Sequence, residues 1–249
     1  MKKNQKQLAV KNFTFTFLFS ISCLFGIAQE NKNEVNLSTG ISIPLITNNN
    51  TSENVASQGS NFSFNYGRVI SRSEKRYLTL NAKYFSVSNS YSLLDSNVKD
   101  LNSNPQLTSL SGVWNGNADK FKLSSYLVGF GFHSYLSKNK KLTSYAKIYI
   151  GNATLISPSL NYTSKNGYSI NVEEVKNSNF IYTSNAGFSY DVLKNISLGL
   201  NVEYAKSSFN FDNQELVYFG ANGAGRDSID PYTFDYSTLN VNAELIFKF

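Results

Sequence analysis

The only histidine of the sequence is the clearest candidate for chemistry. His133 is the single histidine among 249 residues, and an imidazole can serve as a general base, as half of a hydrolase pair or as a proton-linked switch. The alternative is a ring that fills a polar interior through hydrogen bonds. A lone histidine more often has that structural role, so we predict no catalytic residue and no enzymatic activity.

Four charged residues lie where the sequence alternates between polar and apolar side chains: Lys83, Lys147, Glu203 and Glu244. Each falls on the polar face of its segment, so all four should share one side of a sheet. Two cations and two anions in a narrow interior must be compensated, because an unpaired buried charge is costly. We predict a structural ion network there, and the functional alternative is a gate or conduction path.

Metal, cofactor and nucleic-acid binding find no support in the sequence. The aspartates within residues 212–231 do not match the spacing of a calcium loop. The stretch GANGAG in the same region lacks the strand, helix and Lys-Ser/Thr context of a phosphate loop. We therefore predict no metal site and no cofactor.

The first 28 residues have the pattern of a signal peptide. A positively charged start precedes an apolar run over 13–27, and Gly26-Ile27-Ala28 places the small residues Gly26 and Ala28 where a signal peptidase requires them. Export by the Sec route and cleavage would leave residues 29–249 as one barrel domain without cysteine, because Cys23 is removed. Lipidation of Cys23 is the less favoured alternative, since the residue three positions before it is Ser20 and not the usual aliphatic residue.

Removal of this segment also changes the charge. It contains four of the 23 basic residues, which leaves 19 basic residues against 17 acidic ones and a formal charge of +2. The basic character therefore belongs largely to the signal peptide, and it gives no reason to expect a nucleic-acid partner.

Strict alternation of apolar and polar residues recurs in eight segments. The polar face is rich in Gly, Ser and Asn, whereas the wet face of a soluble sandwich would favour Lys, Glu and Asp. Small polar residues suit a crowded barrel interior. The predicted fold is all-β, an eight-stranded antiparallel up-and-down transmembrane barrel with strand cores near 35–43, 60–68, 77–85, 125–134, 143–151, 181–190, 196–204 and 238–248.

The connections between these segments alternate in length. Brief connections at 71–76, 137–141 and 191–195 predict periplasmic turns, and the longer ones predict extracellular loops. Asn166-Gly167 predicts a hairpin within one long loop. We expect no helix outside the signal peptide, and Trp114 should either anchor a partner or pack inside its own loop.

Two stretches and the last residues resemble a known family. "NAGFSYDVLKNISLGLNVEY" (185–204) and "VGFGFHSYL" (128–136) are similar to the small eight-stranded outer-membrane β-barrels of the OmpA/OmpX type. In that family a terminal pattern like Leu245, Phe247 and Phe249 is an assembly signal. The resemblance implies a monomer in the outer membrane of a Gram-negative bacterium, with membrane lipid and the barrel-assembly machinery as partners. Lipid A deacylases of this fold pair histidine with a serine two residues on, where this chain has Tyr135.

These observations favour a structural or surface-interaction role, with long polar loops that could meet an unidentified extracellular ligand. A narrow transporter or channel for a small or hydrophobic solute is the alternative, and a lipid-modifying enzyme is a third. Aromatic belts should mark both membrane interfaces. We expect Tyr66, Tyr77, Tyr190 and Phe249 at the periplasmic interface, and Tyr84, Tyr126, Tyr182 and Tyr204 at the external one.

Overall fold

Long β-strands dominate the structure, a computed structural model that describes residues 32–48, 55–212, 214–220 and 223–249. The proposed signal peptide, residues 1–28, lies outside the described residues. All the predicted strand cores are confirmed, and each lies within a longer strand. The barrel strands are β1 (Asn33–Asn48), β2 (Ala56–Arg72), β3 (Arg76–Tyr91), β5 (Lys120–Tyr135), β6 (Leu142–Ile156), β9 (Lys176–Leu193), β10 (Ile196–Phe211) and β13 (Tyr232–Lys248).

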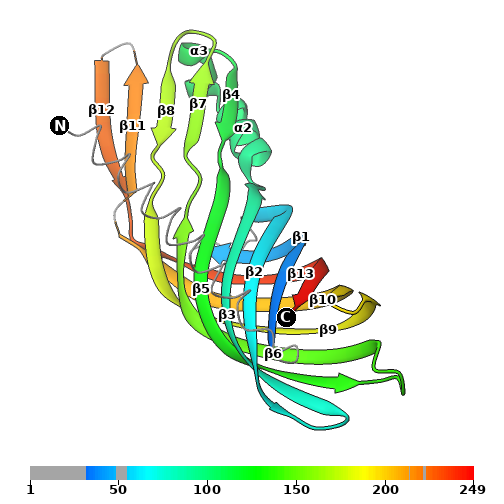
Figure 1. Cartoon of the computed structure of the whole chain (residues 1–249). Coiled ribbons are helices and arrows are strands. Elements are labelled where there is room, and N and C mark those ends of the chain that lie inside the picture. The colour runs from blue at the N-terminus through cyan, green and yellow to red at the C-terminus, as the bar shows by residue number, and fades with distance from the viewer. Residues whose placement is uncertain (1–31, 49–54, 213, 221–222) are drawn as a thin grey trace, which may run out of the picture.

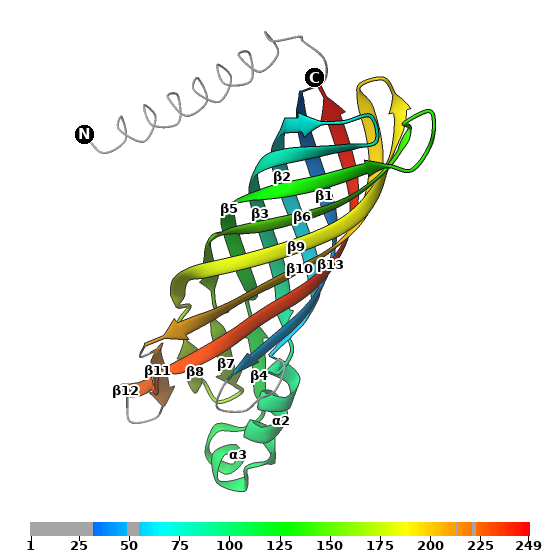
Figure 2. The ribbon, with the colours of Figure 1, turned by 90° about the horizontal axis from the view of Figure 1, so that it is seen from below.

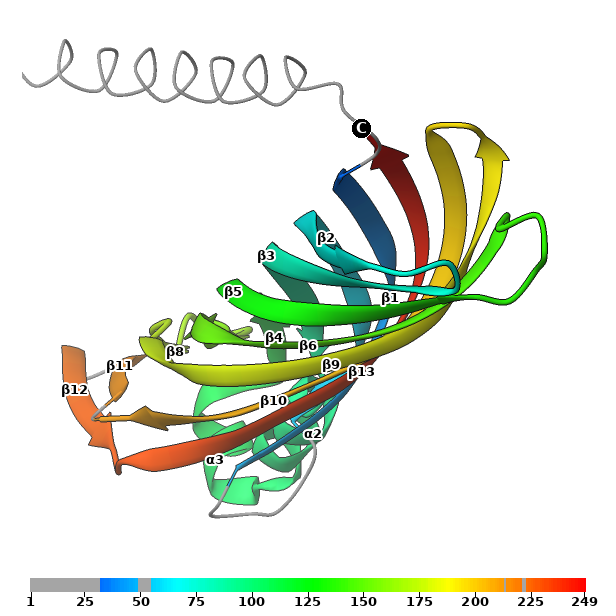
Figure 3. The same cartoon turned by 60° about the horizontal axis from the view of Figure 1, so that its bottom comes forward.

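Within the described residues, these eight strands form a closed barrel in the order β1-β13-β10-β9-β6-β5-β3-β2. Every neighbouring pair is antiparallel, and β1 closes the ring by pairing with both β13 and β2. The strands tilt as they wind around the barrel (Figure 3). The predicted up-and-down transmembrane-type barrel is therefore confirmed as the fold.

The two ends of the barrel differ. At the "turn end", brief connections at 73–75, 136–141 and 194–195 join consecutive strands. The C-terminus lies at this end (Figure 2), where the backbone N–H of Phe249 donates to the carbonyl of Asn33 at 2.9 Å. At the opposite "loop end", the connections are long and contain further strands and helices. The predicted alternation of short and long connections is confirmed.

A second sheet extends beyond the loop end (Figure 1). This "outer sheet" has the order β12-β11-β8-β7-β4 among the described residues. Asn166 and Gly167 form the turn between β7 and β8, with Gly167 at φ 82°, so the predicted hairpin is confirmed. The β11–β12 hairpin was not predicted. The strands are β4 (Trp114–Ala118), β7 (Leu160–Ser164), β8 (Ser169–Val172), β11 (Gln214–Gly220) and β12 (Gly223–Ile229).

Two helices, α2 (Leu94–Ser103) and α3 (Pro105–Ser111), lie beside β4 (Figure 1). The expectation of no helix outside the signal peptide is therefore wrong. Leu94, Val98 and Leu101 form a short apolar stripe on α2, and Leu94 and Val98 lie against Gly116 of β4. No described residue of α2 is buried, and this short stripe in a polar loop was not recognised in the sequence. The start of α3 carries an Asn104 N-cap and Pro105 at its first position. Of the helices that the structure describes, none is long and apolar enough to cross a bilayer.

The inward and outward faces of the barrel exchange their polarity along the strands. On β13, Val241 faces outward and Asn242 inward, whereas nearer the loop end Phe234 faces inward and Asp235 outward. The same reversal occurs on other barrel strands. Because about 9–11 residues of strand cross a bilayer, and the strands have 15 to 18 residues, their loop ends project beyond the apolar band. There the barrel is built like a water-soluble one, with its apolar side chains inside.

The tyrosines expected at the external interface face outward close to this reversal. The ring centroids of Tyr84 and Tyr126 lie 5.3 Å apart, and those of Tyr182 and Tyr204 lie 6.4 Å apart. Tyr77 does not belong to the other interface as predicted, because it is buried in the interior. The reason is register, since residues 77, 79, 81 and 83 share the inward face of β3. A separation of the two aromatic layers by about 25 Å stays a prediction.

Candidate functional site: the barrel interior

Two buried ion pairs connect charged side chains inside the barrel. The ammonium nitrogen of Lys83 lies 2.6 Å from Oε2 of Glu203, and that of Lys147 lies 3.0 Å from Oε1 of Glu34. All four side chains are at most 5% exposed. The structure thus brings Lys83 and Glu203 together but pairs Lys147 with Glu34, which was not among the predicted residues. Glu34 continues the polar face of Asn36 and Ser38, so extending that alternation by one step would have identified it.

Each ion pair spans the interior from one wall to the opposite wall. In the ring order, β3 and β10 are four places apart, as are β6 and β1. Lys83 on β3 therefore meets Glu203 across the full width of the barrel, and Lys147 on β6 meets Glu34 on β1 in the same way. Such contacts fill the passage between the walls.

Glu244 does not pair with a lysine among the described residues. Its carboxylate accepts hydrogen bonds from the amide of Asn36 at 2.8 Å, from the amide of Asn201 and from the hydroxyl of Tyr145. Asn242 donates to Asn201 at 2.9 Å and extends this network. Neutral donors therefore stabilise the third buried carboxylate, and Glu244 does not share a cation with Glu203.

Aromatic rings cover the buried ammonium groups. The nitrogen of Lys83 lies 5.1 Å from the ring centroids of both Phe85 and Tyr149, and that of Lys147 lies 4.9 Å from the Tyr145 ring. A cation held against a ring face in a site without bulk water gains further stabilisation. The rings therefore fix the cations while they occupy space between the walls.

Glycines on neighbouring strands make room for these rings. Gly129 lies opposite Tyr149 in the strand register, and Gly187 lies opposite Tyr145. A Cβ atom on Gly129 would come within 2.8 Å of the Tyr149 ring, and one on Gly187 within 2.6 Å of the Tyr145 hydroxyl. Real side chains do not approach so closely, so glycine is required at both positions.

His133 points inward near the turn end. Its ring stacks on Tyr77 with centroids 4.2 Å apart, and its Nε2 atom shares a hydrogen bond of 3.2 Å with the Thr79 hydroxyl. The same nitrogen lies 3.9 Å from Glu34. The ring is therefore enclosed by interior side chains.

An apolar cluster fills the interior at the loop end. The rings of Phe121 on β5 and Phe234 on β13 meet edge to face at 5.6 Å, and these strands are again four places apart in the ring. This cluster was not predicted, because the alternation of the sequence indicated a polar interior throughout. Its members are Ile46, Val55, Ala56, Phe85, Val87, Phe121, Leu123, Leu127, Tyr149, Ala153, Leu155, Ile181, Ala205, Phe209, Phe211, Tyr232, Phe234 and Tyr236.

The other predicted residues lie outside the barrel interior. Trp114 is buried on β4, where Asn102 bonds to both its backbone N–H and its carbonyl, so the residue packs within its own loop region. Leu245 and Phe247 face outward near the end of β13, and Phe249 follows that strand. Their role as an assembly signal stays a prediction.

The outer surface of the barrel is apolar where the interior is ionic. Phe130, Ile148 and Leu200 face outward and are 64%, 65% and 66% exposed. Soluble monomers seldom expose a continuous apolar band, whereas a lipid-facing barrel requires one. Among the described residues, no group of three or more His, Cys, Asp or Glu side chains could hold a metal ion. The fold and its inverted polarity define a membrane β-barrel of the small outer-membrane type.

No protein-family model and no curated protein matches the sequence. The similar solved structures include Neisserial surface protein A, Ail of Yersinia pestis and the outer membrane protease OmpT from Escherichia coli. Their sequence identities are 11%, 12% and 10%, and their TM-scores are 0.42, 0.39 and 0.47. The matches cover 88%, 87% and 87% of this chain and 97%, 99% and 96% of those chains. Identities of 10–12% indicate nothing about the activity of this chain, and the closed ring of strands with its apolar outer band defines the fold.

Proposed function

We propose that this protein is a closed outer-membrane barrel with a structural or surface-interaction role. The turn end would face the periplasm and the loop end the exterior, as in barrels with short periplasmic turns and long external loops. The observation that carries the proposal is the series of contacts across the interior. From the turn end to the loop end these are Lys147–Glu34, Lys83–Glu203 and Phe121–Phe234.

A narrow transporter would need a path past all of these contacts. The interior of an eight-stranded barrel is just wide enough for its own side chains. Opening a passage would separate two buried ion pairs and expose the apolar cluster to water. The closed state supports a role that does not depend on conduction.

A lipid-modifying enzyme would need its catalytic group on the lipid-facing surface. His133 faces the interior, where it contacts Thr79 and Tyr77. The arrangement supports a non-enzymatic protein, with His133 as an interior packing residue.

Exposed aromatic residues of the outer sheet support the binding of an extracellular ligand. Tyr218 and Phe219 on β11 are 45% and 47% exposed. They line a groove of about 720 Å³ together with Trp114, Tyr168 and other residues of this region. Exposed aromatic side chains beside a groove are common features of binding surfaces.

Recording of single channels in planar lipid bilayers tests the closed barrel. We expect no stable open level for the wild type or for Glu203→Gln. Glu215→Gln is the matched control, because Glu215 forms an exposed ion pair with Arg226 on the outer sheet. A steady wild-type conductance that changes its cation preference in Glu203→Gln but not in the control, with thermal stability unchanged, would establish the transporter instead.

A further inference from the structure

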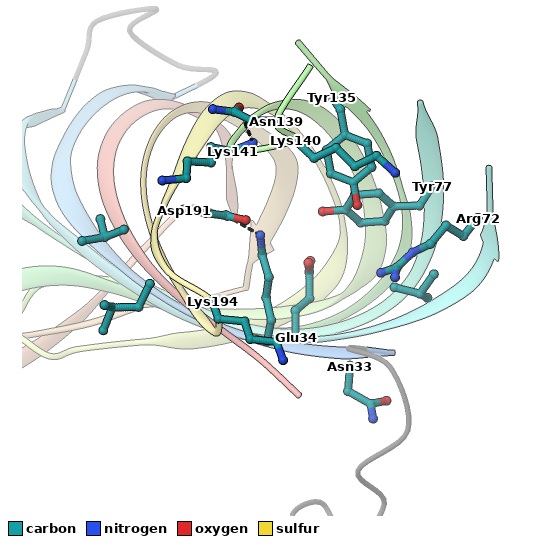
Figure 4. Close-up of a pocket in the computed structure, with 14 residues that line it drawn as sticks. Asn33, Glu34, Arg72, Tyr77, Tyr135, Asn139, Lys140, Lys141, Asp191 and Lys194 are labelled. Carbon is teal, nitrogen blue, oxygen red and sulfur yellow. Dashed lines mark hydrogen bonds and ion pairs between the residues drawn. The ribbon is translucent and has the colours of Figure 1, made fainter. Parts of the chain in front are cut away.

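The turn end of the barrel contains a cavity with a surplus of positive charge. This "mouth cavity" has a volume of about 310 Å³, and side chains from several strands and turns surround it (Figure 4). Its described lining has two carboxylates, Glu34 and Asp191, and five cations, which are Arg72, Lys140, Lys141, Lys194 and Lys248.

Both carboxylates of the mouth cavity already have cationic partners. Asp191 lies 2.5 Å from the ammonium group of Lys248, and Glu34 lies 3.0 Å from that of Lys147. Within the described residues, Lys140, Lys141 and Lys194 form no salt bridge. An uncompensated positive potential therefore remains at the opening, where it attracts an anion.

A β-bulge turns Arg72 towards this cavity. The pairing of β2 with β3 shifts by one residue between Val69 and Ser71, so Arg72 lies opposite the inward-facing Tyr77. Without that shift, the alternation would point Arg72 outward. Its guanidinium carbon lies 5.5 Å from the Tyr77 ring centroid. A bulge that redirects one side chain is a common device beside functional sites.

An unusual backbone conformation places a second cation at the same opening. Lys140 has φ 57° and is the one non-glycine residue with a positive φ in the described part of the chain. This left-handed conformation costs free energy for a residue with a long side chain and is normally occupied by Gly, Asn or Asp. The ammonium group of Lys140 lies 5.7 Å from the ring centroid of Tyr135, which also lines the cavity.

The donors and the shape of the cavity fit a phosphate group. One guanidinium and several ammonium groups around a single opening form the usual surroundings of a bound phosphate. Val69, Val192 and Leu193 also line the cavity, and the last two are exposed. The cavity therefore combines cationic groups with apolar side chains near the membrane surface, as the headgroup and glycerol region of a phospholipid requires.

A second groove leads from the cavity towards the outside of the barrel. It has a volume of about 450 Å³, and its lining includes Lys32 and Arg68. Val69 and Arg72 line both spaces. Arg68 lies opposite the outward-facing Leu80 in the strand register, so this cationic groove reaches the lipid-facing side.

We propose that the mouth cavity binds a phosphate group, supplied by the headgroup of an anionic phospholipid in the adjacent leaflet. Arg72, Lys140 and Lys141 hold the phosphate oxygens, and Val192 and Leu193 contact the glycerol region. A soluble phosphate compound has the same anionic group but cannot use the apolar side chains. This difference allows an experiment to separate the two sources.

Titration calorimetry of the folded barrel in a phosphate-free maltoside detergent tests the site. The probes are dihexanoyl phosphatidylglycerol, glycerol phosphate and inorganic phosphate. The site variant is Lys140→Asn/Lys141→Gln, in which Asn tolerates the left-handed conformation. The control is Lys138→Gln/Lys122→Gln, which removes two exposed lysines outside the cavity lining. Thermal melting of both variants verifies that each one is folded.

We expect phosphatidylglycerol to bind the wild type, to bind the site variant at least about tenfold more weakly, and to bind the control within about twofold. Weak or undetectable binding of the two soluble probes would support the lipid headgroup as the source. Equal binding of all three probes, lost in the site variant, would support the phosphate site and overturn the lipid source. The proposal fails altogether if no probe binds the wild type, or if both variants lose affinity equally.

Discussion

The ion pair between Lys83 and Glu203 allows a test in which the double substitution should be milder than either single one. Glu203→Leu leaves the ammonium group of Lys83 buried and unpaired, and Lys83→Met does the same to the carboxylate of Glu203. Both side chains are at most 2% exposed, so water cannot replace the missing partner. Removal of one member of a buried pair typically costs about 3–5 kcal/mol of unfolding free energy.

The double variant Lys83→Met/Glu203→Leu removes both charges at once. Apolar replacements of similar volume are often neutral or stabilising at such sites. The variant should therefore unfold within about 1 kcal/mol of the wild type. The double variant keeps Phe85 and Tyr149, whose ring centroids both lie 5.1 Å from the Lys83 nitrogen in the wild type. These rings would therefore pack against the methionine side chain at position 83.

Urea unfolding in lipid vesicles, followed by far-ultraviolet circular dichroism, measures these costs. The exposed pair Arg226–Glu215 is the control, since an exposed ion pair contributes at most about 1 kcal/mol. The reasoning would be refuted if the single interior variants cost no more than the control variants. It would also be refuted if the double variant cost the sum of the two single ones.

Three further predictions concern other parts of the molecule. Gly187→Val should sharply reduce the yield of folded barrel, measured by gel mobility without heating, because its Cβ would collide with the Tyr145 hydroxyl; a normal yield contradicts the tight fit. Phe234→Ala should lower the unfolding free energy by about 3–5 kcal/mol in the same urea assay, since it opens a cavity in the apolar cluster; a cost below about 1 kcal/mol would mean that the cluster is loosely packed. Trp114, the only tryptophan, should show a fluorescence transition at lower urea than the dichroism signal, because it reports the outer sheet; coincident transitions would show one cooperative unit.

The barrel strands could be predicted because lipid imposes a strict rule on them. Phe130 and Leu200 must face hydrocarbon, so every second residue is apolar over the membrane-crossing part of each strand. The predicted strands end too early at the loop end, because the polarity of the two faces reverses there. Lys122 faces outward there and Phe121 faces inward. The two-residue period continues, but the outward face is now polar and the inward face apolar.

The interior contacts were only partly predictable. Alternation placed Lys83, Lys147, Glu203 and Glu244 inside, but it contains no information about which charges meet across the barrel. That depends on strand stagger and tilt, which the pattern of a single strand does not specify. The outer sheet and its helices were harder still, because they lack the lipid constraint and bury few of their residues.

The contacts across the barrel also constrain the order in which the chain can fold. Lys83 and Glu203 are 120 positions apart, and Glu34 and Lys147 are 113 apart. Neither ion pair can form within a single hairpin. The opposite walls approach each other only after the sheet has curved and β1 has paired with β13. We therefore expect the interior to form late, after a slow search that is typical of chains with distant contacts. Substitutions at Glu203 should accelerate unfolding and leave the folding rate almost unchanged, and stopped-flow kinetics would show whether they do.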